Sequence, residues 1–68
     1  MKYTIKTTFD TSNSAFDGWN LGSEVTNIMD AVGKRVLAVI EEGAIGYETL
    51  VDSNGNKVGS VVIIEEDK

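Results

Sequence analysis

The sequence predicts a small α+β domain in which one helix packs on a three-stranded antiparallel sheet, in the order strand, helix, strand, strand. Three observations lead to this fold class: alternating residues at the start of the chain, a long helical periodicity in the middle, and two β-rich runs joined by an Asn-Gly turn. Because the chain has 68 residues, we expect one domain over residues 1–64, followed by an acidic tail at 65–68.

The first expected strand is Lys2–Phe9, in which Tyr3, Ile5, Thr7 and Phe9 alternate with more polar residues. This period of two is typical of a strand with one buried face.

Residues 10–22 are rich in Ser, Asn, Asp and Gly, which predicts a loop. Its apolar side chains Ala15, Phe16, Trp19 and Leu21 are numerous enough to pack onto the domain, so we expect an ordered loop. Trp19 has two interpretations, since a tryptophan between glycines is suited both to plug one end of a core and to anchor a partner.

A helix is expected after Ser23, which can cap it, with Glu24 in the first turn and Gly43 at the end. One face carries an apolar stripe at helical spacing that can cover a sheet, formed by Val25, Ile28, Met29, Val32, Val36, Val39 and Ile40. Gly33 interrupts the helix at a cost of about 1 kcal/mol, which close packing by another backbone or side chain would offset. Leu37 lies off the stripe and is a candidate interface residue.

The last two expected strands, Tyr47–Val51 and 57–64, form a hairpin around Asp52, Asn54, Gly55 and Asn56. Asp52 and Asn54 are expected to bond the turn backbone, and Gly55 to supply a positive φ. A two-residue turn pairs Val51 with Val58, whereas a type I turn with a bulge at Gly55 pairs Leu50 with Val58, and both stay open. Gly59 indicates a close backbone approach or a bulge.

The third strand is expected between the other two, since Val61, Val62, Ile63 and Ile64 are apolar on both sides of a strand. One helix covers only one face of the sheet, so either Val61 and Ile63 or Val62 and Ile64 lie on the uncovered face. We expect Val61 and Ile63 there, and a homodimer built on that face.

The rest of that face depends on the hairpin register. Leu50 joins it in the two-residue turn, and Tyr47 and Val51 join it in the bulged turn, with Lys2 and Lys6 at its rim. The alternative is a monomer in which Phe16 and Trp19 of the loop cover the sheet. The candidate interface residues are therefore Trp19, Leu37, Leu50, Val61 and Ile63.

Three segments together resemble a group of small phage and prophage proteins: residues 8–16, the helix start at Glu24 and Val25, and residues 52–59. The shared pattern is a strand, a loop similar to T-D-N-A-A-F, a helix with an acidic start, and a closing D-x-N-G-N-x-V-G hairpin. This resemblance spans nearly the whole chain and implies a phage-encoded accessory protein, without implying a mechanism.

The composition disfavours an enzyme or a metalloprotein. The chain contains no histidine and no cysteine, so acid–base or nucleophilic catalysis would depend on carboxylates, lysines and hydroxyls. The turn at 52–56 alternates oxygen-bearing side chains but lacks the glycine and glutamate that an EF-hand requires. No phosphate-binding glycine motif follows the first strand. We expect no catalytic residue, no metal and no cofactor.

A net charge of −5 disfavours nucleic-acid binding, which depends on lysine and arginine. Glu41 and Glu42 are either a solvated helix end or an acidic patch for a basic partner.

No apolar run is long enough for a signal peptide or a membrane span, so a cytoplasmic location is expected. We therefore expect a protein that binds another protein and acts as an inhibitor of a host or defence protein. The alternative is a nucleic-acid-binding module that uses Lys2, Thr4, Lys6 and Thr8 on the open sheet face.

Overall fold

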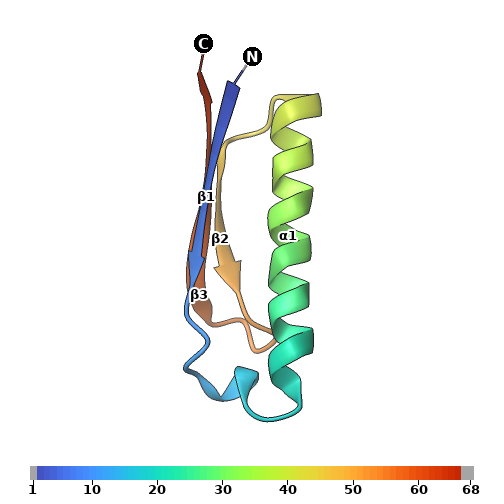
Figure 1. Ribbon diagram of the computed structural model, residues 1–68, viewed down its shortest axis with the longest axis vertical. Coiled ribbons are helices and arrows are strands. Elements are labelled where there is room, and N and C mark those ends of the chain that lie inside the picture. Colours follow the sequence, from blue (N-terminus) through green and yellow to red (C-terminus); the bar gives the residue numbers. More distant parts are fainter. Residues whose placement is uncertain (1, 67–68) are drawn as a thin grey trace.

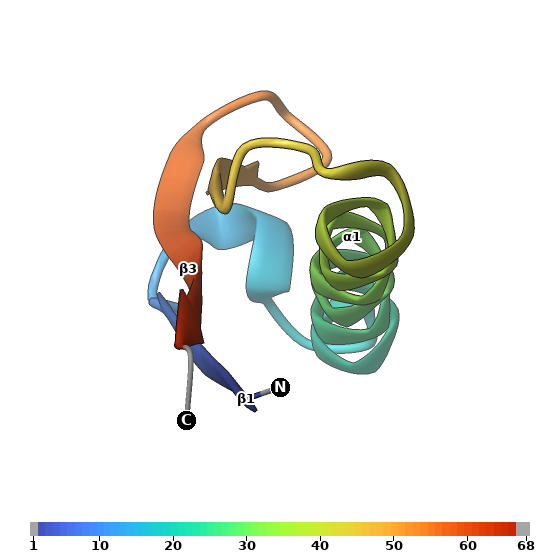
Figure 2. The ribbon, with the colours of Figure 1, turned by 90° about the horizontal axis from the view of Figure 1, so that it is seen from above.

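The computed structural model describes residues 2–66 and has the predicted α+β fold. The elements are β1 (Lys2–Phe9), a short 3-10 helix η1 (Ser14–Phe16), α1 (Asn20–Glu42), β2 (Tyr47–Val51) and β3 (Lys57–Glu66). The strands form one antiparallel sheet in the order β1-β3-β2, with β3 in the centre as the sequence predicts. Figure 1 shows α1 running along one side of the sheet, and Figure 2 shows the two layers end-on.

The register of β1 against β3 decides which side chains share a face. Ile5 lies opposite Ile63, and Thr7 lies opposite Val61, so the odd-numbered side of β1 faces α1 together with these two residues. Lys6 lies opposite Val62, which puts it on the other face.

The hairpin between β2 and β3 combines features of both predicted registers. Gly55 N–H donates to the carbonyl of Asp52 at 3.0 Å, and Gly55 has φ 83°, as in the type I turn with a bulge. Val51 then pairs with Lys57, but Leu50 pairs with Gly59, because a second irregularity leaves Val58 without an opposite residue. From Leu50 back to Tyr47, the pairing with β3 is therefore the one expected for the two-residue turn.

The core lies between α1 and the sheet. Its buried apolar side chains come from the loop, the helix and two strands, and are Ala15, Phe16, Ile28, Val32, Leu50, Val61 and Ile63. The expectation that Leu50, Val61 and Ile63 lie on the uncovered face is therefore wrong: their exposed fractions are 1%, 0% and 5%. The reason is the β1 register, which places the apolar side of β1 on the same face as Val61 and Ile63. Lys2 and Lys6 lie on the opposite face and do not rim these residues.

The helix begins four residues earlier than predicted. The carbonyls of Asp17 and Gly18 accept from Asn20 N–H and Leu21 N–H at 3.1 and 3.3 Å, and these bonds satisfy the first turn without a side-chain cap. Ser23 is inside the helix, where its hydroxyl donates to the carbonyl of Asn20. At the other end Gly43 has φ 71° and its N–H donates to the carbonyl of Val39, so the helix ends where expected.

The predicted apolar stripe of α1 is only partly buried. Ile28 and Val32 lie in the core, and Val25, Val36 and Val39 pack against it. Met29 and Ile40 are 46% and 48% exposed, so these two do not cover the sheet.

The loop is ordered, and it closes one end of the core with Ala15 and Phe16. It does not cover the other face of the sheet, and Trp19 is fully exposed, so the interpretation of Trp19 as a plug is wrong. Glu65 and Glu66 belong to β3, where they pair with Tyr3 and Lys2 rather than forming a tail. The rest of the predicted tail, at 67 and 68, lies outside the described residues.

Candidate functional site

The face of the sheet that points away from α1, here called the outer face, is the first candidate surface. It consists of the alternate residues Lys2, Thr4, Lys6 and Thr8 of β1, Tyr47, Thr49 and Val51 of β2, and Lys57, Ser60, Val62, Ile64 and Glu66 of β3. Across the three strands, Lys6, Val62 and Tyr47 form one row, and Thr8, Ser60 and Thr49 form the next.

The outer face is apolar near its centre and hydroxylated around it. Tyr47 and Ile64 are 47% and 45% exposed, and Val62 is half-buried between its neighbouring strands. At one end, Lys2 Nζ lies 3.6 Å from Glu66 Oε1, and Thr4 Oγ1 donates to Glu66 Oε2 at 2.9 Å. A flat surface with an aromatic side chain and few charges at its centre is typical of a protein–protein contact.

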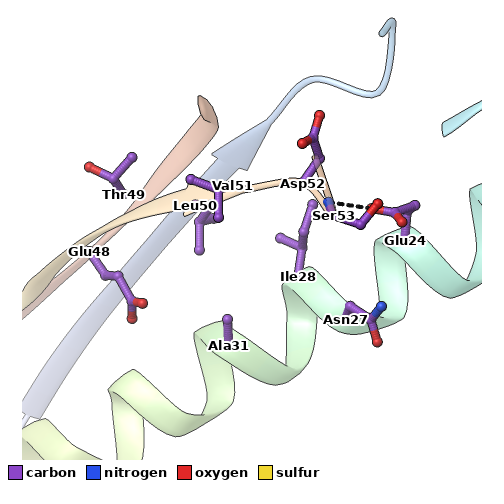
Figure 3. A pocket seen from close by; sticks show the side chains of 10 residues that line it. All are labelled: Glu24, Asn27, Ile28, Ala31, Glu48, Thr49, Leu50, Val51, Asp52 and Ser53. Atoms are coloured by element: carbon purple, nitrogen blue, oxygen red, sulfur yellow. Dashed lines mark hydrogen bonds between the residues drawn. The ribbon is translucent and has the colours of Figure 1, made fainter. Parts of the chain in front are cut away.

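The three segments that carry the phage-protein resemblance meet at one end of the molecule. Asn13 Nδ2 of the loop donates to Asp52 Oδ2 of the hairpin at 2.8 Å, and Ser53 N–H donates to Glu24 Oε1 of the helix at 3.1 Å. Figure 3 shows the second bond, which joins α1 to the turn. Glu24 is buried, so its carboxylate acts as a hydrogen-bond acceptor for the turn and not as an exposed charge at the helix start.

Asp52 is the centre of this polar cluster. Its Oδ1 accepts from the N–H groups of Asn54 and Asn56, both at 2.9 Å, which is the turn geometry that the sequence predicts. The N–H of Asn56 is the main cause that holds the pKa of Asp52 below its usual range, while burial acts in the opposite direction. These hydrogen bonds give Asp52 a structural role in the turn.

A pocket of about 180 Å³ lies between α1 and β2, near the cluster. Three carboxylates line it, Glu24, Glu48 and Asp52, with Ile28, Ala31 and Leu50 among the apolar side chains around them (Figure 3). All three carboxylates are already engaged. Glu24 accepts from Ser53, Glu48 Oε1 lies 3.1 Å from Arg35 Nε, and Asp52 accepts the hydrogen bonds described above. Within residues 2–66, no buried polar side-chain atom lacks a hydrogen-bond partner, and no group of acidic residues is arranged to hold a metal ion.

The remaining predicted site residues are exposed and separate. Leu37 is 56% exposed on α1, and Glu41 and Glu42 are exposed at the end of that helix, at the same end of the molecule as the start of β1 and the end of β3 (Figure 1). From the sequence, Val62 and Ile64 are the other possible uncovered pair and Tyr47 is an uncovered residue of the bulged register, but Val61 and Ile63 are the pair expected there. The structure places Tyr47, Val62 and Ile64 together on the outer face.

Comparison with protein-family models, curated proteins and solved structures finds no significant match to this chain. The resemblance to phage and prophage proteins therefore depends on the motifs alone. Among residues 2–66, no helix has the length and hydrophobicity needed to span a membrane.

Proposed function

We propose that the protein is a non-enzymatic binding protein that contacts another protein through the outer face. The observation that supports this function is the row of Lys6, Val62 and Tyr47, which crosses all three strands and is covered by no described segment. Val62 and Tyr47 supply apolar contact area, and the surrounding hydroxyls of Thr8, Thr49 and Ser60 can bond a partner without carrying charge.

The phage-protein resemblance supports a biological setting for this binding. In this proposal the protein acts in the cytoplasm of the host cell and inhibits a host or defence protein by occupying its contact surface. Exposed Glu41, Glu42 and Glu65 add negative charge at the end of the molecule where α1 and β3 finish, which favours a basic partner.

A nucleic-acid module is the second candidate, because Lys2, Thr4, Lys6 and Thr8 all lie on the outer face. Lys2 is already paired with Glu66, so Lys6 and Lys57 are the lysines of this face that make no ion pair within residues 2–66. Two free lysines on a chain of net charge −5 provide little phosphate neutralisation, so protein binding is favoured.

The proposed function can be tested by affinity capture from a bacterial lysate, with proteins identified by mass spectrometry. Val62→Lys puts a charge at the centre of the outer face, and Asn27→Lys puts the same charge on an exposed position of α1. We expect a protein that the unmodified chain and Asn27→Lys retain and that Val62→Lys loses. The proposal is contradicted if Val62→Lys retains the same proteins as the unmodified chain, or if only nucleic acid is captured at low salt.

A further inference from the structure

A second apolar surface runs along α1 beside the stripe that faces the core. Its positions are three or four residues apart, and it is formed by Trp19, Gly22, Thr26, Met29, Gly33 and Ile40. Half-buried Val36 fills the remaining position in this spacing. Trp19 belongs to the series because its φ of −65° and ψ of −18° are helical. We call this surface the helix seam.

The helix seam is exposed and carries no charge. Trp19 is fully exposed, and Met29 and Ile40 are about half exposed. The charged residues of α1 all lie off the seam, at Glu24, Asp30, Lys34, Arg35, Glu41 and Glu42. An alternating spacing of three and four residues without charge is the pattern of a helix that packs against another helix.

The two glycines of the seam have no explanation within one copy of the chain. A Cβ built at Gly22 or at Gly33 would meet nothing within 4 Å, and neither residue has a positive φ. Glycine inside a helix is unfavourable, so these positions are explained only if another molecule approaches the helix closely there.

We propose that the helix seam packs against the helix seam of a second copy, with the two helices antiparallel. When the twofold axis passes beside Ala31, Met29 of one copy faces Gly33 of the other, Val36 faces Thr26, and Ile40 faces Gly22. Each of these contacts thus pairs a large side chain of one copy with a small residue of the other, and the twofold axis repeats each contact with the two copies exchanged. In the same register Trp19 reaches Gly43, the end of the second helix.

The charges beside the helix seam fit this arrangement. Asp30 and Lys34 lie along the same edge of the seam, and a twofold axis keeps equivalent edges together. Asp30 of each copy therefore lies beside Lys34 of the other, about 3 Å apart along the helix axis, within reach of these side chains. A parallel pair about a twofold axis would instead put the two charged edges on opposite sides of the dimer, so Asp30 and Lys34 could not pair in this way.

The size of the helix seam indicates a weak dimer. The seam is about 30 Å long at 1.5 Å per residue. Two such strips, each about one helix face wide, bury roughly 600–800 Å² in total, below a standard stable interface. We expect dissociation in the micromolar range. This dimer leaves both outer faces uncovered, so the proposal is independent of the proposed function.

Sedimentation equilibrium across micromolar concentrations tests the proposal, with Gly33→Lys as the main variant. In one copy the lysine meets open space and improves helix propensity, so the variant stays folded and becomes no less stable to urea. In the proposed dimer, the lysine side chain occupies the space that Met29 of the second copy needs. We expect the unmodified chain and Asn27→Lys to approach twice the 7.3 kDa monomer mass, and Gly33→Lys to stay at the monomer mass.

The proposal is overturned if the unmodified chain stays at 7.3 kDa at every concentration, or if Gly33→Lys dimerises equally well. It is also overturned if Val62→Lys, and not Gly33→Lys, dissociates the dimer, since the second copy would then lie on the outer face.

Cross-linking tests the antiparallel register, because the chain has no cysteine of its own. Met29→Cys and Gly33→Cys are mixed and oxidised. We expect the disulfide-linked heterodimer to exceed both homodimers severalfold. Homodimers that form as readily as the heterodimer would contradict the antiparallel pairing.

Discussion

Gly59 of β3 lies opposite Phe9 of β1, and packing there leaves no room for a side chain. A Cβ at this position would overlap the carbonyl oxygen of Thr8 and come within 2.6 Å of Phe9 Cα. We expect Gly59→Ala to lower the free energy of unfolding by about 2 kcal/mol or more, measured by urea denaturation.

Gly33→Ala is the matched comparison for Gly59→Ala. No atom lies within 4 Å of its added Cβ, so the same substitution is expected to raise the stability of one copy by up to about 1 kcal/mol. The two changes should therefore have opposite signs. A Gly59→Ala variant that is as stable as Gly33→Ala would contradict the close approach of β3 to β1.

Gly55 shows a different requirement, since its φ of 83° is in the left-handed region. We expect Gly55→Ala to lower the free energy of unfolding by about 1 kcal/mol through backbone strain, without any loss of contacts. An unchanged urea midpoint would contradict the turn geometry.

Asp52 should make stability depend on pH. Its pKa in the folded chain is below the ordinary value of 3.8, so the stabilisation is fully present above that value and is lost as the pH falls through the folded pKa. We expect the difference in unfolding free energy between the unmodified chain and Asp52→Asn to be largest near neutral pH and to shrink below about pH 4. A difference in unfolding free energy that is the same at neutral pH and at acidic pH would contradict this role of Asp52.

The secondary structure elements were largely predictable because their signals are local. The alternation in Lys2–Phe9, the Asn-Gly turn and the glycine at the end of α1 each depend on a few adjacent residues. The start of α1 was not predictable from capping rules, since carbonyls of Asp17 and Gly18, and not a side chain, satisfy its first N–H groups.

The bulge at Val58 was also not predictable from the turn residues. The type I turn with Gly55 alone would pair Leu50 with Val58, and Leu50 would then point away from Val61. The bulge shifts the pairing by one residue, so that Leu50 lies opposite Gly59 and joins the core. Burial of Leu50 explains why the irregularity is stable.

The candidate surfaces were less predictable than the fold, because they depend on which face of the sheet the helix covers. A run of four apolar residues in β3 gives no preference for either face, and only the pairing with β1 distinguishes them. Trp19, Met29 and Ile40 illustrate the same point, since apolar residues at helical spacing do not indicate which side of α1 meets the sheet.

The assignment of the two sheet faces, on which the proposed function depends, is tested most directly by lysine substitutions at adjacent residues of β3. Val61 is fully buried against α1, whereas Val62 lies on the outer face. In urea denaturation, we expect Val61→Lys to lose about 3 kcal/mol or more, or to fail to fold, and Val62→Lys to lose less than about 1 kcal/mol. Equal losses, or a larger loss for Val62→Lys, would contradict the outer face as an open surface.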